Sequence, residues 1–418
     1  MINKSVLQNG LKIISKKIAH IRSVSMGVWV NVGARDENIR QNGLCHFIEH
    51  MIFKGTSRRS AYQIAKEFDA IGGHTNAFTA MEHTCYHAKV LDSHVETMVE
   101  ILTDIFLNST FDPAEIERER PVIFQEIGMV EDAPEEYVHL LAGTDFWGDH
   151  PLGRSILGTR DNILNFDSPT LKAFFSRFYH PERIVIAVCG NVDHDRLVEL
   201  IEPAFGSIAN DQSLPARNIP TISPCMRTCH RSLEQVHICL STPGLSITDP
   251  GRFSLSLLNT LLGGNMSSRL FQEIREQRGL AYSVYSFISS HTDTGQFGVY
   301  TGVHPDNVQQ AIDLIVQAMR RICRNPVSAT ELQDAKEYTK GNLILATESV
   351  DNQMVRLAQN EMHFNGYIPL EWVIEQIEAV STDEIQALAK TLFRADQSSL
   401  TILGPVDEAV DFKSSIVY

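Results

Sequence analysis

The sequence predicts an α+β protein made of two homologous domains, each a mostly antiparallel sheet packed with helices. Strand-like and helix-like blocks are mixed along the chain. A segment with weak periodicity and three prolines, 206–232, separates two such sets of blocks. Similar patterns recur on both sides of this segment, which predicts a duplicated unit.

The first half of the chain begins with strand patterns and continues with helices. An Asn9–Gly10 pair is a hairpin signal, and Asp112–Pro113 supplies an N-cap and a first helical residue. Strands are predicted at 6–14, 24–32, 74–80 and 84–90, helices at 43–53, 61–71, 93–108 and 113–131, and a last helix–strand–helix passage up to residue 205.

The second half repeats parts of this order. Residues 96–102 are echoed by 309–315, and 111–116 by 327–332, although similar helices built to similar rules would give the same likeness. Strands are predicted at 236–241, 282–290, 296–303 and 399–403, a helix at 252–262, and further helices across 305–393. We therefore predict a first domain over 1–208, a linker over 209–229 and a second domain over 230–418.

The composition narrows the classes of function. A net charge of −15, from 51 acidic and 36 basic residues, argues against nucleic acid as a partner. No apolar run is long enough to cross a membrane, and no secretory leader is recognisable, so we expect a cytoplasmic protein. Cys225, Cys229 and His230 could suggest a second metal site, but their spacing favours loop or strand residues whose role beyond structure stays open.

The segment His46-Phe47-Ile48-Glu49-His50 carries the strongest chemical signal. On a helix, His46, Glu49 and His50 fall within one narrow sector, so two imidazoles can bind one metal ion beside a carboxylate that can act as a base. A solvated polar stripe is the alternative, but the neighbouring residues are apolar: Leu44, Phe47, Ile48, Met51, Ile52 and Phe53. Burying three polar groups among them is costly without a metal.

A catalytic zinc site needs a third protein ligand and an open position. Glu126 fits the third ligand, because it is an acid among apolar residues on a predicted helix. Glu119 lies two turns earlier on the same face. Glu119 either orients a ligand or pairs with Arg118 or Arg120, and both alternatives remain open.

This H-x-x-E-H order, inverted relative to H-E-x-x-H and followed at a distance by Glu126, resembles the pitrilysin (inverzincin) family of zinc metallopeptidases. The similarity spans nearly the whole chain and is greatest to the short bacterial branch that resembles the processing peptidases. It includes Asn76-Ala77-Phe78-Thr79, His150-Pro151-Leu152-Gly153-Arg154, Ser267-Ser268-Arg269-Leu270-Phe271, Arg275 and Tyr282.

The resemblance implies roles for particular residues. His46, His50 and Glu126 would bind one Zn²⁺ per chain, and Glu49 would activate a zinc-bound water. Asn76, Ala77, Phe78 and Thr79 would form an edge strand that pairs with the substrate backbone. Arg275 and Tyr282 would contact the substrate and the developing oxyanion.

The duplication limits the number of metal sites. Overlaying 249–264 on 40–55 places Leu255, Leu258 and Asn259 opposite His46, Glu49 and His50, and a similar overlay places Asn342 opposite Glu126. The second domain therefore has the scaffold without the ligands, and we expect one metal site per chain.

These observations predict a zinc hydrolase. The resemblance implies an endopeptidase that hydrolyses peptides or short unfolded polypeptides in an enclosed chamber, with the two domains of each chain forming half of a clamshell. The resemblance implies a homodimer, or a heterodimer with a related subunit, in which Arg275 and Tyr282 of one subunit face the zinc of the other. The alternatives are a non-catalytic partner subunit of the same fold and a zinc hydrolase for other substrates. Manganese or cobalt in place of zinc also remains open.

Overall fold

The computed structural model describes residues 2–210, 215–407, 409, 412 and 415–418. The chain forms two compact units that are both discontinuous in sequence. Unit 1 contains Met1–Gly128, Ser155–Arg217 and Leu345–Tyr367, and unit 2 contains Met129–Arg154, Asn218–Ile344 and Ile368–Tyr418. The predicted domains, 1–208 and 230–418, run continuously along the chain. In the structure, the segment 129–154 from the first half belongs to unit 2, and the segment 345–367 from the second half belongs to unit 1; these are the two exchanged segments.

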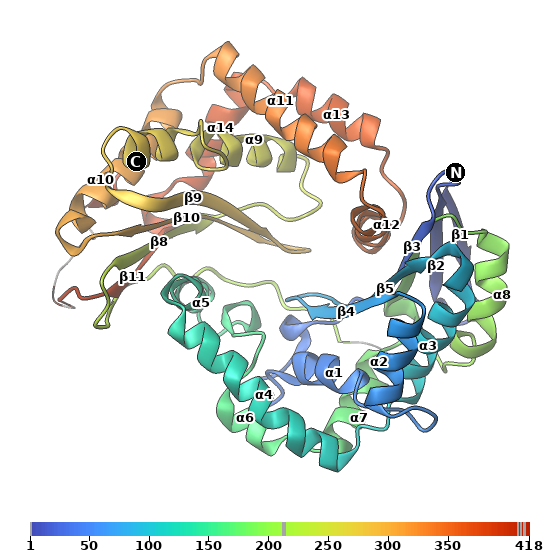
Figure 1. Cartoon of the computed structure of the whole chain (residues 1–418). Coiled ribbons are helices and arrows are strands. Elements are labelled where there is room, and N and C mark those ends of the chain that lie inside the picture. The colour runs from blue at the N-terminus through green and yellow to red at the C-terminus, as the bar shows by residue number, and fades with distance from the viewer. Residues whose placement is uncertain (1, 211–214, 408, 410–411, 413–414) are drawn as a thin grey trace. The chain divides into compact units, whose positions relative to one another are not determined.

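Unit 1 is built on a six-stranded sheet with the order β1-β2-β6-β3-β5-β4. Figure 1 labels the strands of this sheet except β6. Its strands are β1 (Ile2–Val6), β2 (Lys12–Lys17), β3 (Ser23–Val30), β4 (His74–Thr79), β5 (Thr84–Leu91) and β6 (Ile184–Gly190). Only β2 and β6 pair in parallel. The predicted Asn9–Gly10 hairpin joins β1 to β2, and Gly10 has a φ of 90°, which glycine adopts without strain.

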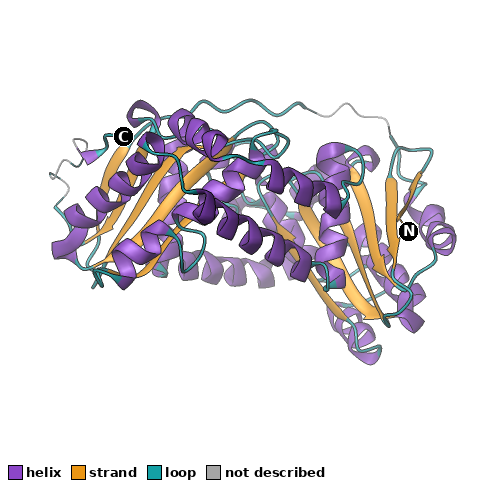
Figure 2. Cartoon of the chain, turned by 90° about the horizontal axis from the view of Figure 1, so that it is seen from above, coloured by secondary structure: helices purple, strands orange, loops and turns teal. Residues whose placement is uncertain are grey.

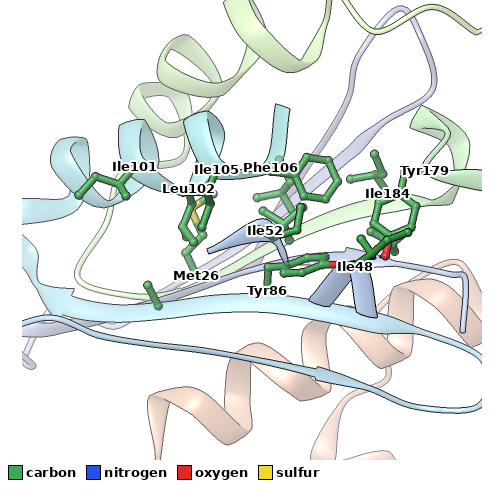
Figure 3. Close-up of a cluster of buried hydrophobic side chains, with 14 of the residues drawn as sticks. Met26, Ile48, Ile52, Tyr86, Ile101, Leu102, Ile105, Phe106, Tyr179 and Ile184 are labelled. Carbon is green, nitrogen blue, oxygen red and sulfur yellow. Dashed lines mark hydrogen bonds between the residues drawn. The ribbon is translucent and has the colours of Figure 1, made fainter. Parts of the chain in front are cut away.

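Helices cover both faces of this sheet. Those of unit 1 are α1 (Leu44–Ile52), α2 (Ala61–Ala70), α3 (Val95–Asn108), α4 (Pro113–Asp132, as far as Gly128), α6 (Arg160–Asn165), α7 (Ser168–Phe178), α8 (His194–Phe205) and α12 (Val350–Phe364). On one face, α1 and α3 contribute to the main core, where Leu102 and Phe106 point toward Met26 and Tyr86 (Figure 3). On the other face, α12 packs Met354 and Leu357 against the sheet.

Unit 2 is built on a five-stranded sheet with the order β7-β11-β8-β10-β9. Its strands, orange in Figure 2, are β7 (Met226–His230), β8 (Val236–Pro243), β9 (Ala281–Ser290), β10 (Gly295–Val303) and β11 (Ser399–Gly404). Its helices are α5 (Pro134–Trp147), α9 (Arg252–Leu262), α10 (Val308–Arg324), α11 (Ala329–Ala346, as far as Ile344), α13 (Leu370–Ala379) and α14 (Thr382–Leu392). A π-helical segment spans Phe271–Glu276.

The two sheets have the same topology, apart from the extra strand β1. The order β2-β6-β3-β5-β4 corresponds to β7-β11-β8-β10-β9, and the parallel pair β2–β6 corresponds to β7–β11. The helix after α4 is α5, and the helix after α11 is α12, so the two exchanged segments occupy equivalent places in the repeats. The fold class is therefore the predicted one: two homologous α+β units.

Most predicted elements are present with ends that differ by a residue or two. Strand β7, however, begins at Met226, inside the segment predicted as a linker. Helix α5 is also absent from the predicted elements. Its buried face follows the positions 138, 141, 142 and 145, but Asp145 interrupts the apolar pattern. Arg227 balances the charge of this carboxylate, and Thr401 donates a hydrogen bond to it.

Among the described residues, no helix is both long and apolar enough to cross a membrane.

Candidate metal centre

Helix α1 begins at a constrained point of the backbone. Gly43 precedes it with a φ of 102°, and a Cβ there would lie 2.9 Å from the Cα of Gly158. The carboxylate of Glu37 accepts hydrogen bonds from the backbone N–H groups of Gly43 and Cys45, at 2.8 and 2.7 Å. Burial raises the pKa of Glu37 to about 7, and these N–H groups oppose that shift. Glu37 therefore fixes the first turn of the helix that carries the metal motif.

Three candidate ligand atoms converge on one point. Nε2 of His46 and Nε2 of His50 are 3.3 Å apart, and Oε2 of Glu126 lies 3.4 Å from the first and 3.3 Å from the second. With metal–ligand bonds of about 2.0–2.1 Å, the ligands of a tetrahedral zinc lie about 3.3–3.4 Å apart. Oε2 of Glu126 is buried without a hydrogen-bond partner among the described residues. The group thus fits a zinc ion in both spacing and chemistry.

Burial sets the protonation of the first imidazole. It lowers the pKa of His46 to about 3, and the neighbouring His50 adds to this effect. His46 is therefore neutral at physiological pH and keeps a nitrogen lone pair for a metal. Burial also lowers the pKa of His50, but the hydrogen bond that the ring donates to Glu119 and the charge of Glu126 outweigh this effect, so the net shift is upward.

Glu119 contacts the other side of the His50 ring. Its Oε1 is 2.8 Å from Nδ1 of His50, and its Oε2 is 2.5 Å from Nζ of Lys54. Burial alone would raise the pKa of Glu119. The hydrogen bonds from His50 and Lys54 lower it by more, so the net shift is downward and the carboxylate stays ionised. A carboxylate in this position orients an imidazole and fixes its tautomer.

The alternative partners of Glu119 are engaged elsewhere. Arg118 pairs with Glu115, and Arg120 pairs with Glu117. The sequence does not predict Lys54 as a partner of Glu119, because a lysine after the end of a helix is not specific to any contact.

Glu49 projects from α1 beside the three candidate ligands. Thr79, at the end of β4, donates a hydrogen bond from Oγ1 to Oε2 of Glu49 over 2.6 Å. Burial raises the pKa of Glu49, although this hydrogen bond opposes the shift. A carboxyl group whose pKa is raised toward neutrality is suited to accept and return a proton.

Strand β4 forms one edge of the unit 1 sheet, because its only strand partner there is β5. The predicted segment from Asn76 to Thr79 belongs to this edge strand. An edge strand leaves its outer backbone groups without a strand partner, although here the N–H of Ala77 donates to Oδ1 of Asn76 over 2.9 Å. Thr79 links that edge directly to Glu49.

Arg275 and Tyr282 lie together in unit 2. Nη1 of Arg275 donates to the backbone oxygen of Tyr282 over 2.8 Å, and the guanidinium stands 4.6 Å from the centre of the Tyr282 ring. The side chain of Tyr282 is 78% exposed. The pair is thus preformed, with its tyrosine accessible to solvent.

The second possible metal site and the unit 2 positions equivalent to the metal motif form no cluster of ligands among the described residues. Among the described residues, His46, His50 and Glu126 are the only cluster of three or more ligating side chains, so Cys225, Cys229 and His230 do not form one. In unit 2, Leu255 and Leu258 are buried in the apolar core.

Comparisons with known proteins identify the family of the chain. The family profile described as "Insulinase (Peptidase family M16)" matches residues 12–160, and "Peptidase M16 inactive domain" matches residues 165–338. An uncharacterized zinc protease of Bacillus subtilis is 40% identical over 97% of this chain and 98% of its own length. The chain belongs to peptidase family M16. The predicted resemblance is confirmed.

Other known proteins are similar over most of their length. An uncharacterized zinc protease of Mycobacterium leprae is 40% identical over 96% of this chain and 91% of its own length. Two crystal structures share the fold. A protease from Helicobacter pylori has a TM-score of 0.90, with 22% identity over 97% of this chain and 99% of that one. A peptidase M16 inactive domain from Pseudomonas fluorescens has a TM-score of 0.91, with 19% identity over 98% and 100%.

Proposed function

We propose that this family M16 protein is a zinc-dependent endopeptidase for peptides or short unfolded polypeptides. His46, His50 and Glu126 hold the zinc, and Glu49 is the catalytic base. The observation that carries the proposal is the spacing of the three candidate ligand atoms, 3.3–3.4 Å, which matches a tetrahedral zinc site. The names of the relatives, zinc proteases, point to the same metal.

The chemistry divides between the metal and the protein. Zinc bound here supplies a Lewis acid that lowers the pKa of water and polarises the scissile carbonyl. Glu49 accepts the proton of the attacking water and returns it to the leaving amine. Thr79 holds the Glu49 carboxylate, and Glu119 holds the His50 ring, so neither group has to reorganise during the reaction.

The edge strand β4 supplies the binding mode for the substrate. An extended peptide that adds to the outer side of Asn76–Thr79 hydrogen-bonds through its backbone, which requires no particular sequence. Because Thr79 ends this strand and contacts Glu49, a bound peptide is held next to the base. This supports a peptide rather than another hydrolysable substrate.

We further infer that the active species is a cytoplasmic dimer of this chain, or a heterodimer with a related subunit, which encloses a chamber around the substrate. In this dimer, Arg275 and Tyr282 act on a peptide bound at the zinc of the partner chain. The exposed Tyr282 ring and its contact with Arg275 support this role, because both groups are preformed and accessible.

A mixed peptide library tests the proposal. The purified protein is assayed for metal content and incubated with the library, with and without a chelator, and the products are identified by mass spectrometry. We expect about one zinc per chain, internal cleavage of peptides, and loss of cleavage with chelator that zinc restores. A protein that binds zinc and cleaves no peptide would instead be a non-catalytic subunit.

A further inference from the structure

Arg217 lies in the segment predicted as a linker, yet its side chain is only 15% exposed. Its guanidinium donates to both oxygens of Asp36, from Nε over 3.1 Å and from Nη2 over 2.8 Å. Nη2 also donates to the backbone oxygens of Asn31, over 3.2 Å, and Glu82, over 2.8 Å. The planar fork of an arginine suits such a set of acceptors, and a lysine cannot reproduce it.

The carboxylates around Arg217 are deeply buried. The side chains of Asp36 and Glu82 are 3% and 4% exposed. Arg35 pairs with Glu82 over 2.7 Å, and Arg183 stands 3.6 Å from Asp36. Without Arg217, Arg35 and Arg183 still balance the charges of the two carboxylates, but Asp36 and the backbone oxygens of Asn31 and Glu82 lose the hydrogen bonds that Arg217 donates. Buried acceptors without donors are costly, so Arg217 stabilises the local structure of this cluster.

The cluster joins two pieces of backbone that both lead to the candidate metal centre. The first is the loop 33–37, in which Asp36 accepts the N–H of Gly33 and which ends at Glu37, the residue that fixes the start of α1. The second is the turn between β4 and β5, which contains Glu82 and follows Thr79 directly.

The loop and the turn are also bonded to each other. The N–H of Ala34 donates to the oxygen of Ala80 over 3.2 Å, and the N–H of Arg35 donates to the oxygen of Met81 over 2.7 Å. At Gly33, a Cβ would lie 2.3 Å from the oxygen of Ala80, so this approach requires glycine. The two pieces are thus packed backbone against backbone, with Arg217 across them.

We infer that Arg217 is a positioning residue for the peptidase site: it holds the β4–β5 turn against the loop before α1 and so keeps Thr79 and the edge strand aligned with Glu49. The inference rests on the proposed function, and it gives the segment between the two halves of the chain a role in catalysis. The contacts of Arg217 are with the β4–β5 turn, the loop 33–37 and Asn31, not with the edge strand β4 or the candidate ligands. Its effect on the site therefore passes through the turn and the loop.

The test compares Arg217→Gln, Arg217→Lys and the control Arg227→Gln in the full chain. Arg227 pairs with the buried Asp145 in unit 2, so its replacement removes an ion pair from the other unit. For each variant, zinc content, kcat and KM on a peptide, and backbone hydrogen exchange are measured.

For Arg217→Gln we expect normal zinc content and faster exchange at Ala34, Arg35 and 80–84. We also expect kcat/KM to fall about 10- to 100-fold, the range for lost supporting contacts around a metal site. Arg217→Lys should show the same changes to a smaller degree, since it keeps the charge without the fork. Arg227→Gln should leave these amides and kcat/KM unchanged.

Wild-type exchange at these amides, or unchanged kcat and KM, in Arg217→Gln would overturn the inference. If Arg217→Gln loses its fold throughout, Arg217→Lys decides in the same way, because it retains the buried charge. If the wild type cleaves no peptide, the proposed function fails, whereas the exchange measurement still decides whether Arg217 holds the turn.

Discussion

Thr79 and Glu49 join the edge strand to the candidate base through one short hydrogen bond, from Oγ1 to Oε2 over 2.6 Å. The two residues come from different elements, β4 and α1. Because the carboxylate of Glu49 is largely buried, the rotamer that it adopts depends on this donor. A peptide that binds along β4 therefore meets a base whose direction the same strand has set.

Replacement of Thr79 by Val removes the hydroxyl and keeps the β-branched shape. A hydrogen bond to a charged group contributes about 1.5–3 kcal/mol, so we expect kcat to fall roughly 10- to 100-fold. KM should change little, because the backbone of β4 is intact. Steady-state kinetics on one peptide measure both constants. Thr79→Ser, which keeps the hydroxyl, is the control, and equal kcat in the Val and Ser variants would show that the bond is dispensable.

Replacement of Glu49 by Gln removes the proton acceptor while the side chain keeps its size. General acid–base catalysis contributes about 10²- to 10⁴-fold, so we expect kcat to fall by at least that range and zinc content to stay the same. Stopped peptide assays combined with metal analysis measure the two quantities. Turnover at the wild-type level would remove Glu49 from the mechanism.

Glu119 should affect the affinity for zinc more than the chemistry. It bonds to Nδ1 of His50 and is itself held by Lys54. Loss of such an orienting carboxylate weakens metal binding about 10- to 100-fold. The chelator concentration that removes half of the zinc should therefore be lower for Glu119→Gln than for the wild type by the same factor. Glu117→Gln, an exposed position on the same helix, is the control. Equal zinc affinity in both variants would mean that Glu119 only forms an ion pair and does not orient the His50 ring for the metal.

Local patterns predicted the parts of the fold that depend on local spacing. The apolar periodicity of 44–52 and the spacing of His46, Glu49 and His50 define a helix and its polar face without reference to any other segment. Glu126, by contrast, reaches this face only through the packing of α4, and the sequence alone identified it through its setting and the family resemblance.

The residues that sequence analysis missed act across the fold. Glu37 caps a helix that begins several residues later, Lys54 holds a carboxylate of another helix, and Arg217 bridges a loop and a turn from outside both. No periodicity or motif marks such contacts. The exchange of α5 and α12 is hidden for the same reason, since the residue pattern of a helix does not say which of the two sheets it packs against.

The exchanged helix α12 should be essential to the stability of unit 1. Leu357 is 1% exposed and packs in the cluster with Trp29, whose indole N–H points to the sulfur of Met354 over 3.2 Å. Leu357→Ala should cost about 2–5 kcal/mol, because it leaves a cavity in a closed core. Thermal unfolding measures the loss, with the exposed Gln359→Ala as control. A midpoint shared by both variants would mean that α12 contributes little.

Mixing two inactive variants tests whether Arg275 and Tyr282 serve the zinc of the partner chain. Glu49→Gln alone lacks the base, and Tyr282→Phe alone lacks the exposed hydroxyl, so each homodimer should be slow. In a mixed dimer with sites shared between chains, one site combines an intact Glu49 with an intact Tyr282. Activity should therefore rise on mixing, in proportion to the mixed dimers measured by native mass spectrometry. If both residues serve the zinc of their own chain, no site is complete and mixing restores nothing. A chain that remains monomeric with full turnover would exclude the shared site altogether.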